Sequence, residues 1–457
     1  MAETLKYFIY TFGCQMNEHD SESLAGLCES MGYERAAALG DASLILLNTC
    51  CVRGNAANRI YGHIGNLKPL KEMRPEVILA VCGCMAQDPS ERERIKTVCP
   101  HVDLVFGPQN LHDFPRLLQA VQSGEGRVIQ VDLGPGSVRE DLPVRRASDL
   151  KAWVTIIQGC NNFCSYCIVP YVRGRERSRQ PERIAAEVGE LAAGGVREVT
   201  LLGQNVNSYG HDLDREGVDF PALLRRLDAT PGLERLRFMT SHPKDLSARL
   251  IEAMAECGTV CEHLHLPVQA GSDRILALMN RGYDRRHYLG LVERLRAAVP
   301  AITLTTDIIV GFPGETEADF TATLDLVREV RFDGAYTFAY SPKLGTKAAG
   351  LADQLAEETK RERLYRLIEL QNEISRQKNE AMRGAIEEVL VEGPSERNPA
   401  VWCGRTRGNK LVLFPGPAAV GTLLPVRIDE PQTWTLHGKP IGEMSGGLTQ
   451  DIKSTVF

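Results

Sequence analysis

Apolar and polar positions follow two different patterns between Tyr7 and Gln122. Short apolar runs are separated by stretches in which apolar residues recur at helical spacing, such as 21–32 and 91–98. The short apolar runs are typical of buried strands, and the stretches with helical spacing are typical of amphipathic helices. We therefore predict an open parallel α/β domain over residues 1–131. Its strands are expected at 6–13, 44–50, 77–83 and 102–108.

The same alternation returns between residues 150 and 375. Helical stretches at 181–195 and 274–279 separate a further series of apolar runs. Repeated strand–helix units of this kind predict a β/α barrel, partial or complete. Its strands are expected at 152–159, 196–205, 235–241, 263–269, 304–312 and 334–341. Residues 132–149 lack periodicity and carry Gly, Pro and charges, so we predict an interdomain linker there.

The pattern changes again near the end of the chain. A charged helix from about 357 to 383 is followed by short strands broken at Gly and Pro turns. This pattern predicts a small antiparallel β-barrel over residues 376–443, with a tail at 444–457. No apolar stretch approaches the roughly 20 residues that span a bilayer. We expect a cytoplasmic protein, and its net charge of −6 neither requires nor excludes a nucleic-acid partner.

The chain contains thirteen cysteines. Disulfides are rare in a reducing cytoplasm, so clustered cysteines indicate a metal or redox site. Cys160, Cys164 and Cys167 form a C-x₃-C-x₂-C loop after the first strand of the second domain. Three thiolates can hold three irons of a cubane cluster and leave the fourth iron open to a small molecule. Structural zinc is the alternative, but it requires a fourth ligand, and no further Cys or His lies near this loop in sequence.

This loop resembles the signature of radical S-adenosylmethionine enzymes, whose open iron binds the amino and carboxylate groups of that cofactor. The N-terminal domain is similar to that of the methylthiotransferases of this superfamily, at residues 13–17 (GCQMN), 48–50 (NTC) and 83–87 (GCMAQ). The C-terminal barrel resembles a TRAM domain, a small RNA-binding module. The resemblance covers nearly the whole chain and implies two 4Fe–4S clusters. The ligands of the second, auxiliary cluster would be Cys14, Cys50 and Cys84.

The positions of these three cysteines are compatible with one site. Each ends an apolar run, and the carboxyl ends of parallel strands meet at one edge of an open sheet. Spacing alone leaves Cys51 and Cys82 as alternatives, which we interpret as buried small hydrophobic residues. We interpret the other scattered cysteines as structural residues. They are Cys28, Cys99, Cys257, Cys261 and Cys403. Two of them, Cys257 and Cys261, are four residues apart and could also bind a metal.

The resemblance also implies which residues contact S-adenosylmethionine. Tyr166 lies between two cluster ligands, and the others end strands at the rim where a β/α barrel builds its site. These others are Gln204, Asn205, Ser241, Gln269 and Gly311. A strand-ending turn is the alternative at each. Three histidines are candidate ligands by residue type, but we interpret them as satisfied or partly buried: His242, His263 and His265.

Two basic segments are candidates for RNA contact. The first follows the cluster loop, where its side chains could meet phosphates beside a substrate base, and a solvated surface is the alternative. It comprises Arg173, Arg175, Arg177 and Arg179. The second surrounds a turn of the predicted barrel and comprises Arg405, Arg407 and Lys410.

The resemblance implies methylthiolation at C2 of N6-isopentenyladenosine beside the tRNA anticodon, since residues 48–53 and 169–179 are most similar to that branch. One S-adenosylmethionine would donate the methyl group, and another would yield a 5′-deoxyadenosyl radical. Polar acid–base catalysis suits this carbon badly, because an aromatic C–H is both a poor acid and a poor electrophile. The implied partners are tRNA, an electron donor such as flavodoxin or ferredoxin, and a sulfur donor; we expect a monomer.

Three alternatives remain open at this point. Two lie within the family, acting on threonylcarbamoyladenosine in tRNA or on a ribosomal-protein aspartate. The third is a non-catalytic RNA-binding or iron-sensing protein with structural clusters. Structural clusters normally have four protein ligands, whereas each site here supplies three.

Overall fold

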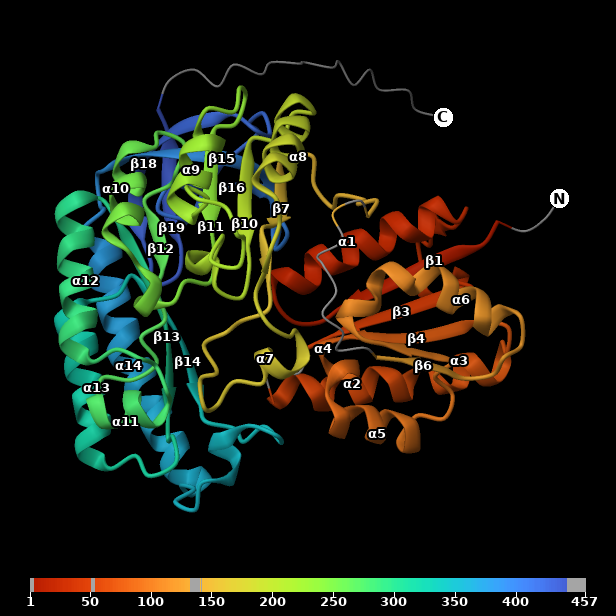
Figure 1. The fold of residues 1–457 in the computed structure, drawn as a ribbon. Helices are drawn as coiled ribbons and strands as arrows, with labels where there is room; N and C mark the ends of the chain where they lie inside the picture. Colours follow the sequence, from red (N-terminus) through yellow and green to blue (C-terminus); the bar gives the residue numbers. More distant parts are fainter. Residues whose placement is uncertain (1–3, 51–53, 132–139, 141, 442–457) are drawn as a thin grey trace, which may run out of the picture.

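The computed structural model describes residues 4–50, 54–131, 140 and 142–441 (Figure 1). Cys51, the predicted tail and most of the predicted linker lie outside these ranges. The described residues form an N-terminal sheet, a central pair of sheets and a small closed barrel.

The N-terminal sheet has six parallel strands in the order β2-β1-β3-β4-β5-β6. They are β1 Lys6–Thr11, β2 Glu34–Arg35, β3 Leu44–Thr49, β4 Ile78–Gly83, β5 Leu104–Phe106 and β6 Val128–Gln130. Helices α1 (Gln15–Ser30) and α6 (Phe114–Gln122) pack on one face; α2 (Gly54–Asn66), α3 (Lys68–Met73) and α5 (Pro89–Val98) pack on the other. Strand β3 is buried at every position because both faces are covered. The predicted α/β fold is confirmed.

The central domain consists of two three-stranded parallel sheets, β11-β10-β7 and β12-β13-β14. The strands are β7 Lys151–Thr155, β10 Glu198–Leu202, β11 Arg235–Phe238, β12 His263–His265, β13 Thr303–Val310 and β14 Gly334–Ala339. The helices are α8 Pro181–Ala193, α9 Phe220–Asp228, α10 Ala248–Glu256, α11 Asp273–Leu278, α12 Arg285–Ala298 and α13 Glu317–Val330. A bridge between Leu236 and Val260 continues the first sheet toward the second. Among the described residues no pairing joins β7 to β14, so the predicted barrel is a partial one.

Helix α14 (Glu357–Glu380) leads into a closed barrel in the order β15-β16-β17-β19-β18. Its strands are β15 Ile386–Ser395, β16 Asn398–Thr406, β17 Leu411–Pro415, β18 Leu423–Pro431 and β19 Leu436–Pro440. The predicted small barrel is confirmed, with one parallel pair, β17–β19, among otherwise antiparallel pairs. This pair is parallel because β18 serves as its crossover. In the described part of the chain, no helix is long and apolar enough to cross a membrane.

Candidate active site

The cysteine loop of the central domain holds Cys160, Cys164 and Cys167 between β8 (Ile157–Gln158) and α7 (Val169–Val172). Burial, and then the neighbouring Cys164, raises the pKa of Cys167 to about 12. Burial is also the main cause that raises the pKa of Cys160 to about 11. These thiols are therefore protonated at neutral pH in the metal-free protein, and binding of iron has to displace their protons.

Backbone geometry fixes the base of this loop. The N–H of Cys160 donates to the Gly174 carbonyl at 3.1 Å, and β8 pairs with β9 (Arg177–Ser178). Gly159 has φ +82°, and a Cβ there would overlap the Arg175 carbonyl. Only glycine fits such a close approach at positive φ. The glycine before Cys160 is thus a condition for the loop that carries all three thiols.

A buried arginine lies beside the loop. Arg281 is 4% exposed, and its Nη1 lies 3.2 Å from Cys164 Sγ and 3.3 Å from the Tyr166 hydroxyl oxygen. Its Nη2 donates to the Pro267 carbonyl at 2.9 Å. Arg281 therefore ties the cysteine loop to the chain that follows β12. Sequence reasoning missed this residue because it follows an apolar helix without any recognisable motif.

Four buried polar atoms follow the carboxyl ends of β10, β11 and β12. They are Asn205 Oδ1, Ser241 Oγ, His242 Nε2 and Gln269 Oε1, and none has a hydrogen-bond partner among the described residues. The His242 ring packs 5.7 Å from that of Tyr283, whose hydroxyl bonds the Val268 carbonyl, so these strand ends are connected. Buried polar atoms are normally satisfied. This set therefore fits a polar ligand such as S-adenosylmethionine.

Gln204 and Gly311, two further predicted cofactor contacts, have partners within the protein. Gln204 Oε1 accepts a hydrogen bond from the Gly159 N–H at 2.5 Å and so supports the cysteine loop. Gly311 has φ +71°, and its N–H donates to Glu315 Oε1 at 2.9 Å. The Lys360 side chain occupies the space into which a Cβ of Gly311 would project. In this structure both residues shape the rim of the site.

The second cysteine set, Cys14, Cys50 and Cys84, follows the carboxyl ends of β1, β3 and β4, which are neighbours in the sheet. Cys50 and Cys84 are buried and Cys14 is exposed. Gly13, with φ +131°, lies so close to Cys50 that a Cβ would be 2.6 Å from the Cys50 Cβ. The fold thus gathers at one sheet edge three residues that are far apart in sequence.

Asn17 holds the loops of this edge together. Its Nδ2 donates to the carbonyls of Phe12 at 2.9 Å and Thr49 at 3.0 Å, and its Oδ1 lies 3.9 Å from Cys14 Sγ. Cys82 is placed differently, since it packs in the apolar layer on the opposite side of the sheet from Cys84. Of the two alternative ligands, Cys82 is therefore separated from this edge, and Cys51 lies outside the described residues.

The donor sets fit clusters better than single ions. Across the described residues, no three Cys, His or carboxylate side chains are gathered to hold one metal ion. A cubane cluster spreads three thiolates over three different irons, so its ligands lie further apart than those of one tetrahedral ion. A trio of cysteines around each site is the donor set that such a cluster requires.

The arginine run after the first loop is largely buried, unlike the exposed surface that RNA contact requires. Arg173 and Arg179 are 5% and 6% exposed, and Arg179 pairs with Glu187 at 2.7 Å. Arg177 is half-buried and donates to the Arg173 carbonyl at 3.3 Å. Arg175 is exposed and stacks 4.4 Å above the Phe163 ring. Of the four predicted contacts, Arg175 is the most exposed.

The side chain of Arg173 reaches the other cysteine set. Its Nε lies 3.3 Å from Cys84 Sγ, and its Nη2 lies 2.7 Å from Asp20 Oδ2 and 3.2 Å from Asn17 Oδ1. Burial lowers the pKa of Arg173, but the negative charges around it, that of Asp20 first, raise it by more, so the guanidinium stays charged. A residue of the central domain thereby completes the second cysteine site.

The basic turn of the small barrel faces the central domain. Arg407 pairs with Glu262 at 2.7 Å, and Lys410 with Asp333 at 3.2 Å. Arg405 lies 3.5 Å from Glu392 within the barrel, and Arg237 of β11 donates to the Arg407 carbonyl at 2.7 Å. Arg407 and Lys410 therefore help to dock the barrel on the central domain, whereas Arg405 pairs within the barrel; contact of these three residues with RNA stays a prediction.

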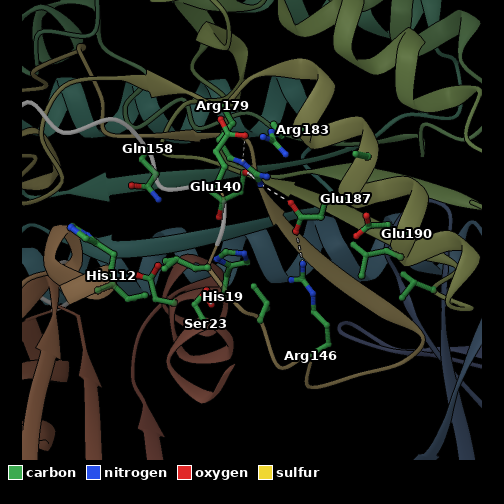
Figure 2. A pocket seen from close by; sticks show the side chains of 18 of the residues that line it. His19, Ser23, His112, Glu140, Arg146, Gln158, Arg179, Arg183, Glu187 and Glu190 are labelled. Atoms are coloured by element: carbon green, nitrogen blue, oxygen red, sulfur yellow. Dashed lines mark hydrogen bonds and ion pairs between the residues drawn. The ribbon is translucent and has the colours of Figure 1, made fainter. Parts of the chain in front are cut away.

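A cavity of about 570 Å³ lies between α1 and α8. Figure 2 shows Arg146, Arg179 and Glu187 pointing toward one another at this cavity, and Arg146 also pairs with Glu22 of α1 at 3.1 Å. No cysteine is among its described lining residues. We interpret it as part of the ionic junction between the two domains.

The other two candidate histidines and the scattered cysteines lie inside the fold. His263 and His265 are buried, and His265 Nε2 lies 3.5 Å from Asp307 Oδ2. Burial lowers the pKa of His263 well below its usual value, so this ring is neutral. The scattered cysteines are buried or half-buried: Cys28, Cys99, Cys257, Cys261 and Cys403.

The fold and the cysteine loop define a radical S-adenosylmethionine protein. The family model of the radical SAM superfamily matches residues 154–327, that of Uncharacterized protein family UPF0004 matches 6–107, and that of the TRAM domain matches 380–441. A solved structure of the radical S-adenosylmethionine methyltransferase TsrM from Kitasatospora setae has the same fold, with TM-score 0.55 and 16% identity, covering 76% of this chain and 77% of that one.

Two curated relatives are similar over nearly the whole length. The tRNA-2-methylthio-N(6)-dimethylallyladenosine synthase of Acetivibrio thermocellus is 54% identical, over 94% of this chain and 90% of the relative. The enzyme of the same name from Moorella thermoacetica is also 54% identical, over 96% of this chain and 100% of the relative. The chain belongs to the tRNA-2-methylthio-N(6)-dimethylallyladenosine synthase family.

Proposed function

We propose that this protein attaches a methylthio group to C2 of N6-dimethylallyladenosine in tRNA, and that it uses S-adenosylmethionine both as methyl donor and as radical source. The observation that carries the proposal is the pair of three-cysteine sites, joined by the 3.3 Å contact between Arg173 and Cys84. A single radical site is compatible with many reactions, whereas a second open cluster offers a place for the transferred sulfur. Relatives named for this product support the same conclusion.

Each cysteine set would hold one 4Fe–4S cluster. Cys160, Cys164 and Cys167 would hold the cluster that binds S-adenosylmethionine, and the auxiliary ligands would be Cys14, Cys50 and Cys84. When bound, the first cluster supplies one-electron cleavage of S-adenosylmethionine, and the second supplies the site at which sulfur is methylated and transferred.

The surrounding residues orient the cofactor and keep its site closed. The unsatisfied atoms of Asn205, Ser241 and Gln269 would bind the polar groups of S-adenosylmethionine. Arg281 holds the Cys164 and Tyr166 side chains in place as a buried cation. Burial at this rim also excludes water, which protects a radical from side reactions.

We also propose the partners that this reaction requires. The TRAM domain supports a tRNA substrate, and exposed Arg175, close to the cysteine loop, is our candidate for contact with a phosphate beside the target base. A reductant such as flavodoxin or ferredoxin would supply electrons, and a separate donor would supply sulfur. We propose a monomer located in the cytoplasm, where tRNA is modified.

The test is anaerobic incubation of the reconstituted protein with reductant, S-adenosylmethionine and tRNA that carries N6-dimethylallyladenosine, followed by nucleoside mass spectrometry. We expect a methylthio mass gain on that nucleoside alone. Formation of 5′-deoxyadenosine with an unchanged nucleoside would overturn the proposed substrate. Threonylcarbamoyladenosine tRNA and the ribosomal protein, the substrates of the two alternative branches, are the matched controls, and we expect no product with either.

A further inference from the structure

Arg173 belongs to one cysteine loop by sequence and to the other cysteine site by contact. It lies six residues after Cys167, directly after α7, and the carbonyl of the next residue, Gly174, accepts the N–H of Cys160 at 3.1 Å. Its backbone is therefore fixed to the loop of the central domain.

The guanidinium of Arg173 is surrounded by the N-terminal domain. Among the described residues, its side chain contacts Cys84, Asp20 and Asn17, at 3.3, 2.7 and 3.2 Å. Asp20 is also buried, so the ion pair is shielded from solvent. An arginine buried at this depth requires partners of this kind, because an unpaired buried charge is strongly destabilising. The contact with a thiol sulfur is therefore built into the domain junction.

The geometry points to Arg173 as a positioning residue of the auxiliary cluster: we propose that its N–H donates to the Cys84 thiolate and that its charge raises the reduction potential of that cluster. This inference rests on the proposed function, since it assumes that Cys14, Cys50 and Cys84 hold a cluster. Hydrogen bonds to the sulfurs and nearby charge are the protein's means of setting such potentials. A cation beside the cluster stabilises its more negative, reduced form.

Arg173 also links the two cysteine sites mechanically. Because the same short segment carries Arg173 and is bonded to Cys160, any displacement of the cysteine loop also moves the guanidinium at Cys84. The loop that binds S-adenosylmethionine thus holds the auxiliary site at a fixed separation. A buried guanidinium with three polar contacts holds this position more firmly than an exposed one would.

The experiment isolates the auxiliary cluster in the full-length protein. Cys160, Cys164 and Cys167 are replaced by Ala, and the remaining cluster is titrated by EPR at controlled potential, with iron content and thermal unfolding measured in parallel. Into this parent we introduce Arg173→Met and Arg173→Lys. Arg175→Met is the matched control, since it removes an equal charge two residues away that is exposed and lies over Phe163.

We expect a lower reduction potential and an altered EPR spectrum for Arg173→Met, a smaller shift for Arg173→Lys, and no shift for Arg175→Met. If Arg173→Met fails to fold because Asp20 is left unpaired, the double variant Asp20→Asn/Arg173→Met removes that charge and is expected to show the lowered potential. An unchanged potential and spectrum in the folded variant would overturn the inference while leaving the proposed function intact. If the parent itself holds no cluster, the auxiliary assignment within the proposed function fails, and the inference fails with it.

Discussion

The two cysteine sites are built in opposite ways. The site of the central domain takes Cys160, Cys164 and Cys167 from one loop, so its ligands are neighbours in sequence. The other site, proposed for the auxiliary cluster, takes Cys14, Cys50 and Cys84 from the ends of three strands. Each site also has a buried arginine against one thiol, Arg281 at Cys164 and Arg173 at Cys84. One site can therefore be read as a local motif, whereas the other exists only once the sheet is assembled.

The largest expected effect separates the two sites by reaction step. Replacing Cys160, Cys164 and Cys167 by Ala should reduce formation of 5′-deoxyadenosine to background. Replacing Cys14, Cys50 and Cys84 by Ala should leave that cleavage in place and abolish the methylthio product. Chromatography of deoxyadenosine and mass spectrometry of nucleosides measure the two outcomes. Retention of product in the second variant would show that these cysteines are not the auxiliary ligands.

Glycine substitutions should also affect the two cysteine sites separately, but less severely than loss of the cysteines. Gly159→Ala places a Cβ against the Arg175 carbonyl, and Gly13→Ala places one against Cys50. Each residue is at positive φ, so each substitution should cost about 1–3 kcal/mol of local stability. We expect Gly159→Ala to lose iron from the central site and Gly13→Ala to lose it from the auxiliary site, as measured by iron content and EPR. Gly124→Ala, at φ +85° with open space around it, controls for backbone strain without a clash.

A pH-dependent loss of stability should arise at the central site. Burial first, and then Arg281 and Lys244, lowers the pKa of His242 to about 2. The unfolded histidine titrates near 6.5, so the unfolded state binds the proton first as pH falls, and stability is lost below about pH 6.5. Between pH 7 and 5 the metal-free protein should lose about 2 kcal/mol through this group.

The matched variant for this prediction is His242→Asn, which retains an acceptor for the Lys244 N–H that His242 Nδ1 accepts at 3.2 Å. Urea unfolding of both proteins at pH 7 and pH 5 gives the comparison. The difference in unfolding free energy between the two pH values should be smaller in the variant by about 2 kcal/mol. Equal pH dependence in the two proteins would mean that His242 is not the group responsible.

The smallest expected effect concerns RNA affinity. Arg175→Ala should weaken tRNA binding uniformly and reduce the dependence of log affinity on log salt by about 1, without a change in stability. Arg407→Ala should instead destabilise the protein by about 1–3 kcal/mol, because it leaves Glu262 without its pair. Filter binding at several salt concentrations and thermal unfolding distinguish a phosphate contact from a docking contact.

The sequence predicted the cysteine site that lies in one loop more directly than the one assembled from three strands. Strand and helix alternation gave the fold of all three domains, and the C-x₃-C-x₂-C spacing located one loop. Arg281 escaped notice because its role depends on a contact with Cys164, 117 residues away. For Arg173 and Arg407 the sequence showed the charge but not where the side chain points. A run of arginines looks the same in sequence whether its side chains face solvent or a buried carboxylate.

The docked turn of the small barrel fixes the barrel at the end of the central domain opposite the cofactor site. Arg407 and Gly408 contact Glu262 and Thr303, at the amino ends of β12 and β13, whereas the unsatisfied cofactor-site atoms follow the carboxyl ends of the strands. The eight residues of β13 span roughly 26 Å at about 3.3 Å each. The tRNA proposed as substrate, if held by the barrel, would have to bridge that length for its base to reach the rim of the cofactor site.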